Sequence, residues 1–237
     1  MDRTVFSPTR PKLEVPLTLL REHPSYVGGG GAGEDDAEEI GRRIFGHIAS
    51  RMGIDDFSNI SMLDFGCGAR GALSIINTPL AIQKYTGVDI DKELISFLKE
   101  NAVRSNVNFA HADFVNTLYS GTDSAEIITT SSKLPIPDEE YDLACMLNVL
   151  IHQYPDHAAA LLSIMHRYVG KGGYLFFTVL MNREGENFDN IDISQPYLMA
   201  SYTREVMEEL LRLAGWETVS IERPSDLLQT SYLCRRN

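Results

Sequence analysis

A glycine-rich segment carries the clearest chemical signal in this chain. Gly66, Gly68 and Gly71 have the spacing G-x-G-x-x-G between a run typical of a strand and a run typical of a helix. Glycines at such a turn let a ligand approach the backbone closely, and the helix that follows presents free N–H groups. Asp89 ends the next predicted strand, where a carboxylate can accept hydrogen bonds from ribose hydroxyls. Together these residues predict a nucleoside site.

Asp64, two residues before the first glycine, bears on which nucleoside is bound. A dinucleotide turn must hold a pyrophosphate, and a carboxylate at this position opposes that charge. The same carboxylate is well matched to an ammonium group or to a polarised backbone amide. The sequence therefore argues against NAD, although an NAD-dependent oxidoreductase stays open as an alternative.

Further segments extend this pattern along the chain. They are residues 63–68 (LDFGCG), 87–91 (GVDID), 110–114 (AHADF), 134–143 (LPIPDEEYDL), 148–152 (NVLIH) and 171–175 (KGGYL). In this order they resemble the motifs of the class I S-adenosylmethionine-dependent methyltransferases, and the resemblance covers about residues 36–222. The resemblance implies S-adenosylmethionine as the cofactor.

The resemblance also implies which residues hold that cofactor. Asp89 would bind the ribose and Asp113 the adenine edge, with a helix cap as the alternative role for Asp113. Phe114 would pack on the adenine ring or belong to the core. Cys67 is explained by its small size rather than by nucleophilicity, and Asn148 would border the transferring end. The full expected set is Asp64, Gly66, Cys67, Gly68, Asp89, Ile90, Asp113, Phe114 and Asn148.

The elements that position these residues follow from the spacing of apolar side chains. Short apolar runs predict strands, and helical spacing predicts the helices between them, so βαβ units and a mostly parallel sheet are expected. The predicted strands are residues 61–64, 85–89, 107–111, 142–147 and 174–180, and the predicted helices are 71–83, 92–103 and 155–169, the last ended by 171–173.

The C-terminal part has a different pattern. A helix near 203–214 precedes two strand candidates near 216–222 and 229–235. The connection between these strands is too short for a crossover helix, so the last strand must be antiparallel. The resemblance implies the same arrangement: an α/β, Rossmann-like three-layer sandwich with a seven-stranded, mostly parallel sheet whose last strand is antiparallel.

Two segments are candidates for covering a methyl acceptor. Residues 1–33 contain four prolines and end in a glycine run, which predicts an irregular arm that is either a linker or a lid, ahead of a methyltransferase domain at 34–237. Apolar Leu13 and Val15 indicate that part of this arm packs. Residues 181–201 are long for a connection and predict either a substrate cover or a locally packed insertion.

Single side chains complete the candidate site. His152 is the candidate general base, because a neutral imidazole can accept a proton near pH 7. The alternative is a histidine that is structural or lines the cofactor pocket. Tyr26, Tyr154 and Tyr197 are candidates for an acceptor pocket, although tyrosines are often simply half-buried.

The amino-acid composition limits the kinds of molecule that the protein is expected to bind. The chain holds 21 Lys and Arg against 33 Asp and Glu, a formal net charge of −12, which disfavours nucleic acid and anionic membrane surfaces. Its three cysteines have no short spacing, so neither a disulfide framework nor a zinc site is expected, and a reducing, cytoplasmic setting is predicted. No apolar run has the length of a membrane span. The oligomeric state stays open.

The sequence therefore predicts a methyltransferase that moves the methyl group of S-adenosylmethionine to a small molecule, with oxygen favoured as the methylated atom and no metal required. The alternatives are an NAD-dependent oxidoreductase and a non-catalytic module that kept the fold and the cofactor site.

Overall fold

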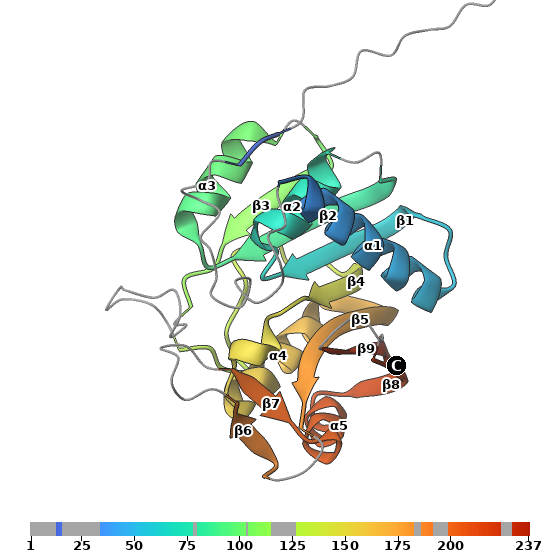
Figure 1. Cartoon of the computed structure of the whole chain (residues 1–237), viewed down its shortest axis with the longest axis vertical. Coiled ribbons are helices and arrows are strands. Elements are labelled where there is room, and N and C mark those ends of the chain that lie inside the picture. Colours follow the sequence, from blue (N-terminus) through green and yellow to red (C-terminus); the bar gives the residue numbers. More distant parts are fainter. Residues whose placement is uncertain are drawn as a thin grey trace, which may run out of the picture.

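The computed structural model describes residues 13–15, 34–77, 80–102, 104–114, 127–182, 186–191, 199–223 and 229–237. A nine-stranded sheet lies at the centre of the molecule (Figure 1). Seven of its strands, in spatial order, are β3 (Val107–His111), β2 (Ile82–Asp89), β1 (Phe57–Phe65), β4 (Tyr141–Met146), β5 (Val169–Met181), β9 (Thr230–Arg236) and β8 (Trp216–Glu222). The first five run parallel, and β9 runs antiparallel to both β5 and β8. This arrangement confirms the predicted Rossmann-like sheet with its antiparallel last strand.

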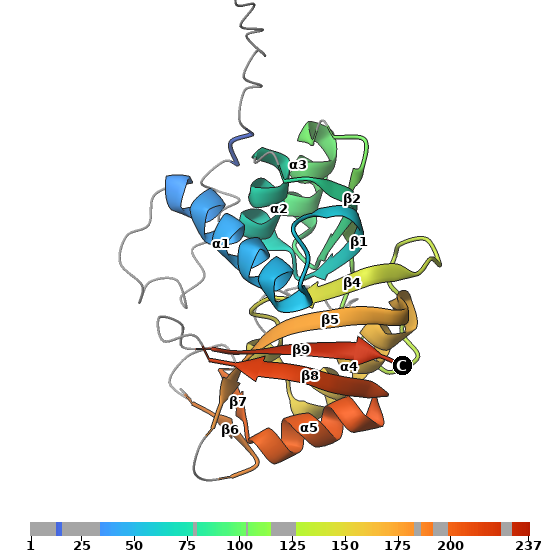
Figure 2. The same ribbon diagram turned by 90° about the vertical axis from the view of Figure 1, so that its right-hand side faces the viewer.

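Helices cover both faces of the sheet and give the predicted three layers (Figure 2). The helices α1 (Glu34–Met52), α2 (Gly68–Asn77) and α3 (Lys92–Asn101) pack on one face, and α4 (Pro155–Tyr168) and α5 (Arg204–Leu213) pack on the other. Each face has its own apolar cluster. Strands buried on both faces read as continuous apolar runs, which is why the parallel strands were recognisable in the sequence.

Several predicted boundaries are wrong, among them the start of β1, which begins at Phe57 rather than at residue 61. The helix expected over 71–83 begins at Gly68 and ends at Asn77, and β2 begins at Ile82, because Ile82 and Tyr85 are buried in the sheet rather than on a helix face. The segment 171–173, expected to end the helix before it, lies inside β5. Gly172 has a φ of +82° there, and the pairing of β5 with β4 shifts register at this point. A glycine accommodates such an irregularity within a strand.

The segment 181–201 contains two further strands. These are β6 (Phe188–Asn190) and β7 (Ala200–Tyr202), which pair antiparallel with each other, while β7 runs parallel to the end of β5. The buried Tyr202 hydroxyl donates to the carbonyl oxygen of Gln153 at 2.5 Å, which ties this addition to the segment between β4 and α4. It therefore extends the sheet at the carboxyl end of β5.

A short piece of the predicted N-terminal arm packs against the domain. The Leu13 N–H donates to Asn77 Oδ1 at 2.8 Å, and Asn77 Nδ2 donates to the Leu13 carbonyl oxygen at 2.9 Å. Val15 is 3% exposed and joins the apolar cluster beneath α1, α2 and α3. Residues 13–15 are thus held at the C-terminal end of α2.

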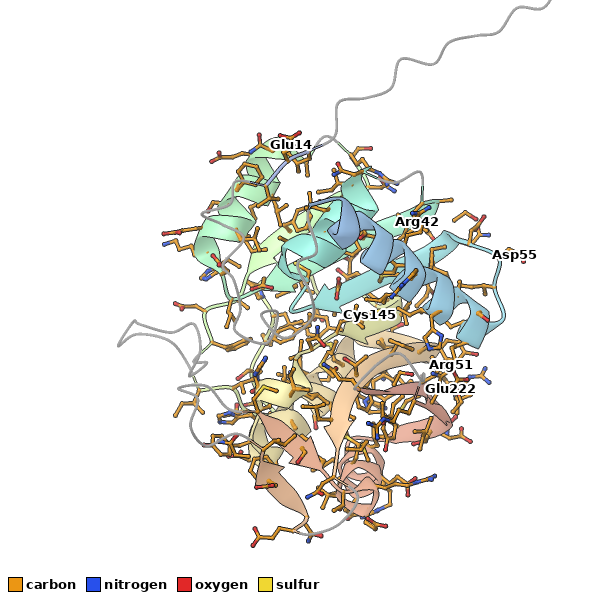
Figure 3. All side chains as sticks on the ribbon, in the orientation of Figure 1. Glu14, Arg42, Arg51, Asp55, Cys145 and Glu222 are labelled. Carbon is orange, nitrogen blue, oxygen red and sulfur yellow. The ribbon has the colours of Figure 1, made fainter. Side chains whose placement is uncertain are left out.

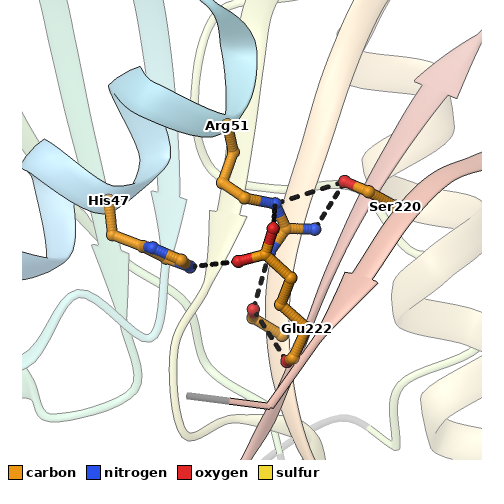
Figure 4. Close-up of polar contacts among 5 residues, drawn as sticks. His47, Arg51, Ser220 and Glu222 are labelled. Atoms are coloured by element: carbon orange, nitrogen blue, oxygen red, sulfur yellow. Dashed lines mark hydrogen bonds and ion pairs between the residues drawn. The ribbon is translucent and has the colours of Figure 1, made fainter.

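Arg51, in the last turn of α1, ties this helix to the C-terminal strands (Figure 4). Its Nη1 donates to Ser231 Oγ at 2.8 Å and its Nη2 to Ser220 Oγ at 2.6 Å. Its Nε lies 3.4 Å from one carboxylate oxygen of Glu222, whose other oxygen is 3.7 Å from His47 Nε2. Burial lowers the pKa of Arg51, and Glu222 opposes this shift. In Figure 3, Arg51 and Glu222 lie side by side at the end of α1.

Replacing Arg51 tests how much this contact contributes to stability. Because the side chain is 5% exposed and makes several charge-assisted hydrogen bonds, we expect Arg51→Ala to lower the free energy of unfolding by about 2–3 kcal/mol. Arg212→Ala is the control, since Arg212 pairs with Glu209 on an exposed helix face and a solvated surface pair contributes little to stability. Urea unfolding measures both, and equal losses would contradict a special role for Arg51.

Candidate active site

The glycine turn between β1 and α2 has the geometry that the spacing predicts. Gly66 and Gly68 have φ values of +75° and +52°, which favour glycine. A Cβ at Gly66 would lie 2.4 Å from Val149 Cγ2, so the turn has no room for a side chain. A Cβ at Gly68 would meet nothing within 4 Å. The turn is therefore packed against Val149, in the segment that follows β4, on one side and is open at the start of α2.

Asp89, at the end of β2, fastens this turn. Its Oδ2 accepts the Gly68 N–H at 2.8 Å and its Oδ1 accepts the Asp91 N–H at 2.9 Å. The N–H groups of Gly66 and Cys67 donate to the Val88 carbonyl oxygen. Burial raises the pKa of Asp89, while the backbone N–H donors oppose this shift. Each carboxylate oxygen keeps a lone pair for one more donor.

Asp64 is a second carboxylate, one strand away, and unlike the half-buried Asp89 it is fully buried. It is 1% exposed, and its Oδ2 accepts the Tyr85 hydroxyl at 2.7 Å. Its Oδ1 is buried and has no hydrogen-bond partner among the described residues. Burial raises the pKa of Asp64 to about 7, with a smaller contribution from the charge of Asp89 and with Tyr85 acting in the opposite direction. A buried oxygen of this kind is costly unless a donor or a cation reaches it.

The third glycine and the cysteine of the motif have packing roles. A Cβ at Gly71 would lie 3.1 Å from Asp64 Oδ2, so Gly71 lets α2 lie close to the carboxylate. Cys67 is buried, and its Sγ would lie 2.9 Å from a Cβ at Gly87. Burial, followed by the charges of Asp89 and Asp64, raises the pKa of the Cys67 thiol. A neutral thiol is a poor nucleophile, so Cys67 fills space in this structure.

The end of β3 lies beside the end of β2. The Ala112 N–H donates to the Asp89 carbonyl oxygen at 2.9 Å, which places the exposed Asp113 at this edge of the sheet. Ile90 is half-buried, and its carbonyl oxygen lies 3.1 Å from a ring nitrogen of His111. Phe114 is buried against Phe65, with ring centroids 6.4 Å apart. Whether Asp113 caps a helix concerns residues outside the described ranges.

Asn148 follows β4 in an unusual backbone conformation. Its φ is 59°, the left-handed region, and no other described residue except glycine has a positive φ. Its N–H donates to Thr178 Oγ1 at 3.0 Å, and its Oδ1 accepts from Gln229 Nε2 at 2.6 Å. Gln229 and Thr178 were not predicted as site residues. The strained φ identifies Asn148 as a position that its surroundings hold in place.

The remaining candidates lie around the short helix η2 (Leu150–His152). His152 ends η2 and is half-buried, and its N–H donates to the Val149 carbonyl oxygen at 3.1 Å. Tyr154 is 48% exposed, and its ring centroid lies 5.7 Å from that of Phe188 in β6. Tyr26 and Tyr197 lie outside the described residues.

Neither a membrane helix nor a metal cluster is found in the part of the chain that the structure describes. No helix there is long and apolar enough to cross a bilayer. No group of three or more His, Cys, Asp or Glu side chains in the same ranges could hold a metal ion.

Comparison with known proteins identifies the family. The family described as a methyltransferase domain matches residues 37–221, most of the chain. The chain belongs to this family, which confirms the predicted membership of the class I S-adenosylmethionine-dependent methyltransferases at the level of family and fold.

Individual relatives are more distant. The uncharacterized protein MJ0284 of Methanocaldococcus jannaschii is 34% identical over 99 residues, which are 40% of this chain and 41% of that protein. The alignment therefore spans less than half of that relative. The cyclase SpnF has a TM-score of 0.59 at 18% identity, covering 82% of this chain and 80% of that one. Magnesium protoporphyrin IX methyltransferase from Synechocystis PCC 6803, solved with bound SAM, has a TM-score of 0.55 at 14% identity, covering 89% and 88%. These structures share the fold.

The buried Asp64 gives a pH prediction for the protein without ligand. Its folded pKa of about 7 lies above the unfolded value of about 3.9. Between these pH values the folded state binds more protons than the unfolded state, so the contribution of Asp64 to stability falls as pH rises and reaches its minimum above pH 7. Asp64→Asn keeps an oxygen for Tyr85 and removes this dependence.

Unfolding in urea between pH 5.5 and 7.5 measures the effect. We expect the stability of the wild type, relative to Asp64→Asn, to fall by up to about 1.4 kcal/mol per pH unit below pH 7 and then to level off. Parallel pH profiles for the two proteins would show that Asp64 is ionised throughout.

Proposed function

We propose that the protein transfers the methyl group of S-adenosylmethionine to a small molecule, and that the methylated atom is an oxygen. The observation that carries the proposal is a pair of carboxylates at an open glycine turn, the buried Asp64 and the half-buried Asp89. Membership of the methyltransferase-domain family supports it.

The residues present fit this cofactor. The unpartnered Asp64 Oδ1 suits an ammonium group, directly or through a bridging donor, and a cation there offsets the cost of burying the carboxylate. The lone pairs that remain on Asp89 suit two ribose hydroxyls. Open space at Gly68 allows close approach to the backbone. Ile90, Asp113 and Phe114 would take the adenine.

When bound, S-adenosylmethionine supplies a methyl group already activated by a sulfonium. The protein then has to orient the acceptor in line with that methyl and keep water away from it. Asn148 lies next to Val149, which packs on Gly66, so Asn148 would border the transferring end. An imidazole nitrogen of His152 would take the hydroxyl proton of the acceptor as the new carbon–oxygen bond forms, while the bond between the methyl carbon and the sulfur breaks and S-adenosylhomocysteine is released.

Tyr154 and the addition formed by β6 and β7 would wall the acceptor side, and Tyr26 and Tyr197 stay candidates for the same wall. The net charge of −12 favours a small acceptor over nucleic acid. The described cysteines are free and buried, which supports the proposed cytoplasmic setting.

A second candidate function is a fold that binds the cofactor without methylating. SpnF has a similar fold and is named as a cyclase, and function does not follow from fold alone. Formation of S-adenosylhomocysteine in an acceptor screen distinguishes the two, since only methyl transfer produces it.

Cofactor titration tests the binding assignment. We expect the protein to bind S-adenosylhomocysteine and to show no comparable affinity for NAD. Asp89→Ala should weaken the binding of S-adenosylhomocysteine about 10-fold to 100-fold, because buried ribose hydroxyls would lose their acceptor. Asp138→Ala, at an exposed position, is the control. Isothermal titration calorimetry measures the three proteins. Preferential NAD binding, or unchanged affinity in Asp89→Ala, would contradict the assignment.

His152→Gln tests the proposed base. Turnover with a hydroxyl acceptor should fall about 100-fold while affinity for S-adenosylhomocysteine is retained, because general-base catalysis typically contributes that factor. The pH profile of kcat should also lose the limb that reports imidazole protonation. A variant with normal turnover and an unchanged profile would assign His152 a structural role.

A further inference from the structure

The hydrogen bond between Asn148 and Gln229 joins the end of β4 to the start of β9. Gln229 Nε2 donates to Asn148 Oδ1 at 2.6 Å. Gln229 Oε1 is buried, and the described residues offer it no hydrogen-bond partner. The Asn148 side chain is exposed, and no described residue hydrogen-bonds its Nδ2. The hydrogen bond between the two amides therefore joins Gln229 Nε2 to Asn148 Oδ1. It leaves Gln229 Oε1 and Asn148 Nδ2 available for a ligand.

Both residues are held from several directions. The Asn148 N–H donates to Thr178 Oγ1 in β5, which supports the positive φ of Asn148. Gln229 directly precedes β9, whose first residues pair with the end of β5. Ser231, two residues further on, accepts the hydrogen bond from Arg51. The pair is thus pre-organised by the sheet and by α1 and needs little rearrangement to bind a ligand.

The pair lies where a methyl acceptor would have to be. Asn148 precedes Val149, whose Cγ2 would lie 2.4 Å from a Cβ on Gly66 in the cofactor turn. Thr178 and Gln229 lie at the carboxyl end of β5 and beside it, and ligands of open α/β sheets bind at the carboxyl ends of the strands. The position is on the β4–β5 side of the turn, away from Asp89 on β2.

The chemistry of the reserved groups selects a class of ligand. They are one acceptor, Gln229 Oε1, and one donor, Asn148 Nδ2. Exchanging the oxygen and nitrogen of both amides gives the same total of one acceptor and one donor. A carboxylate only accepts hydrogen bonds, so it would leave Gln229 Oε1 without a donor. An ammonium only donates, so it would leave Asn148 Nδ2 without an acceptor. A hydroxyl does both.

We propose that Asn148 and Gln229 bind the methyl acceptor through a neutral hydroxyl, with Gln229 as a residue that positions the acceptor and determines its specificity. The inference rests on the proposed methyl transfer and adds the substrate class: a neutral alcohol or phenol rather than an acid or an amine. Binding its O–H to Gln229 Oε1 satisfies an oxygen whose burial without a partner is otherwise costly.

The test uses three probes of similar size, phenol, benzoate and benzylammonium, and needs no knowledge of the natural acceptor. The full-length protein, labelled with nitrogen-15 and saturated with S-adenosylhomocysteine, is titrated with each probe while the side-chain amide signals of Asn148 and Gln229 are followed by NMR. We expect phenol to shift both signals and to bind at least about fivefold more tightly there than either charged probe. Stronger binding of benzoate or benzylammonium at these signals, or no phenol-dependent shift, would overturn the proposal.

Gln229→Leu supplies the matched variant, and Gln83→Leu, at an exposed position in β2, supplies its control. Gln229→Leu should weaken phenol at least about fivefold and leave the affinity for S-adenosylhomocysteine unchanged, while Gln83→Leu should change neither. Equal phenol affinity in the two variants would overturn the proposal. If Gln229→Leu does not fold, the comparison of the three probes on the wild-type protein still tests the proposal. Failure of S-adenosylhomocysteine to bind the wild type would instead contradict the proposed function.

Discussion

Two carboxylates at the ends of neighbouring parallel strands are the constraint around which this site is built. Asp64 is buried and Asp89 is half-buried, and the charge of Asp89 adds to the raised pKa of Asp64. The glycine turn offsets the cost of removing the Asp89 carboxylate from water, because Gly68, with its positive φ, donates its N–H to that carboxylate. Asp64 receives only the Tyr85 hydroxyl and keeps one oxygen unpaired among the described residues. The site is thus balanced only once a cation or donor arrives.

The scaffold keeps this unbalanced site in place by fixing the strands from both faces. On one face Arg51 connects α1 to β8 and β9, so the first helix and the last two strands of the described chain act on each other directly. Arg51 also reaches Ser231, two residues from Gln229, so the same contact lies next to the proposed acceptor position. Packing and polar contacts on the α1 face therefore serve stability and the site together.

Contacts between residues close together in the sequence could be predicted from it, whereas contacts between distant residues could not. The glycine turn and Asp89 were predictable, because a strand, a turn and a helix impose local spacing. The end of α2 was not, since Ile82 fits a helical spacing as well as a strand and only its burial in the sheet decides between them. The contact between Asn148 and Gln229 spans 81 residues and follows from the antiparallel pairing of β5 with β9, so no local pattern reports it.

The hydrogen-bonding groups of the proposed acceptor site bear on how an oxygen acceptor would react. Gln229 Oε1 can only accept a hydrogen bond, so an alkoxide or phenolate formed in advance would face this buried oxygen without a proton to donate to it. Deprotonation is therefore favoured late, when the carbon–oxygen bond is forming and the hydroxyl oxygen gains positive charge and becomes more acidic. A hydrogen bond from the hydroxyl to Gln229 Oε1 would hold the acceptor in its neutral form until then, and the O–H would turn from Gln229 Oε1 to an imidazole nitrogen of His152 to give up its proton. Holding the acceptor neutral and removing its proton late both follow from the buried Gln229 Oε1.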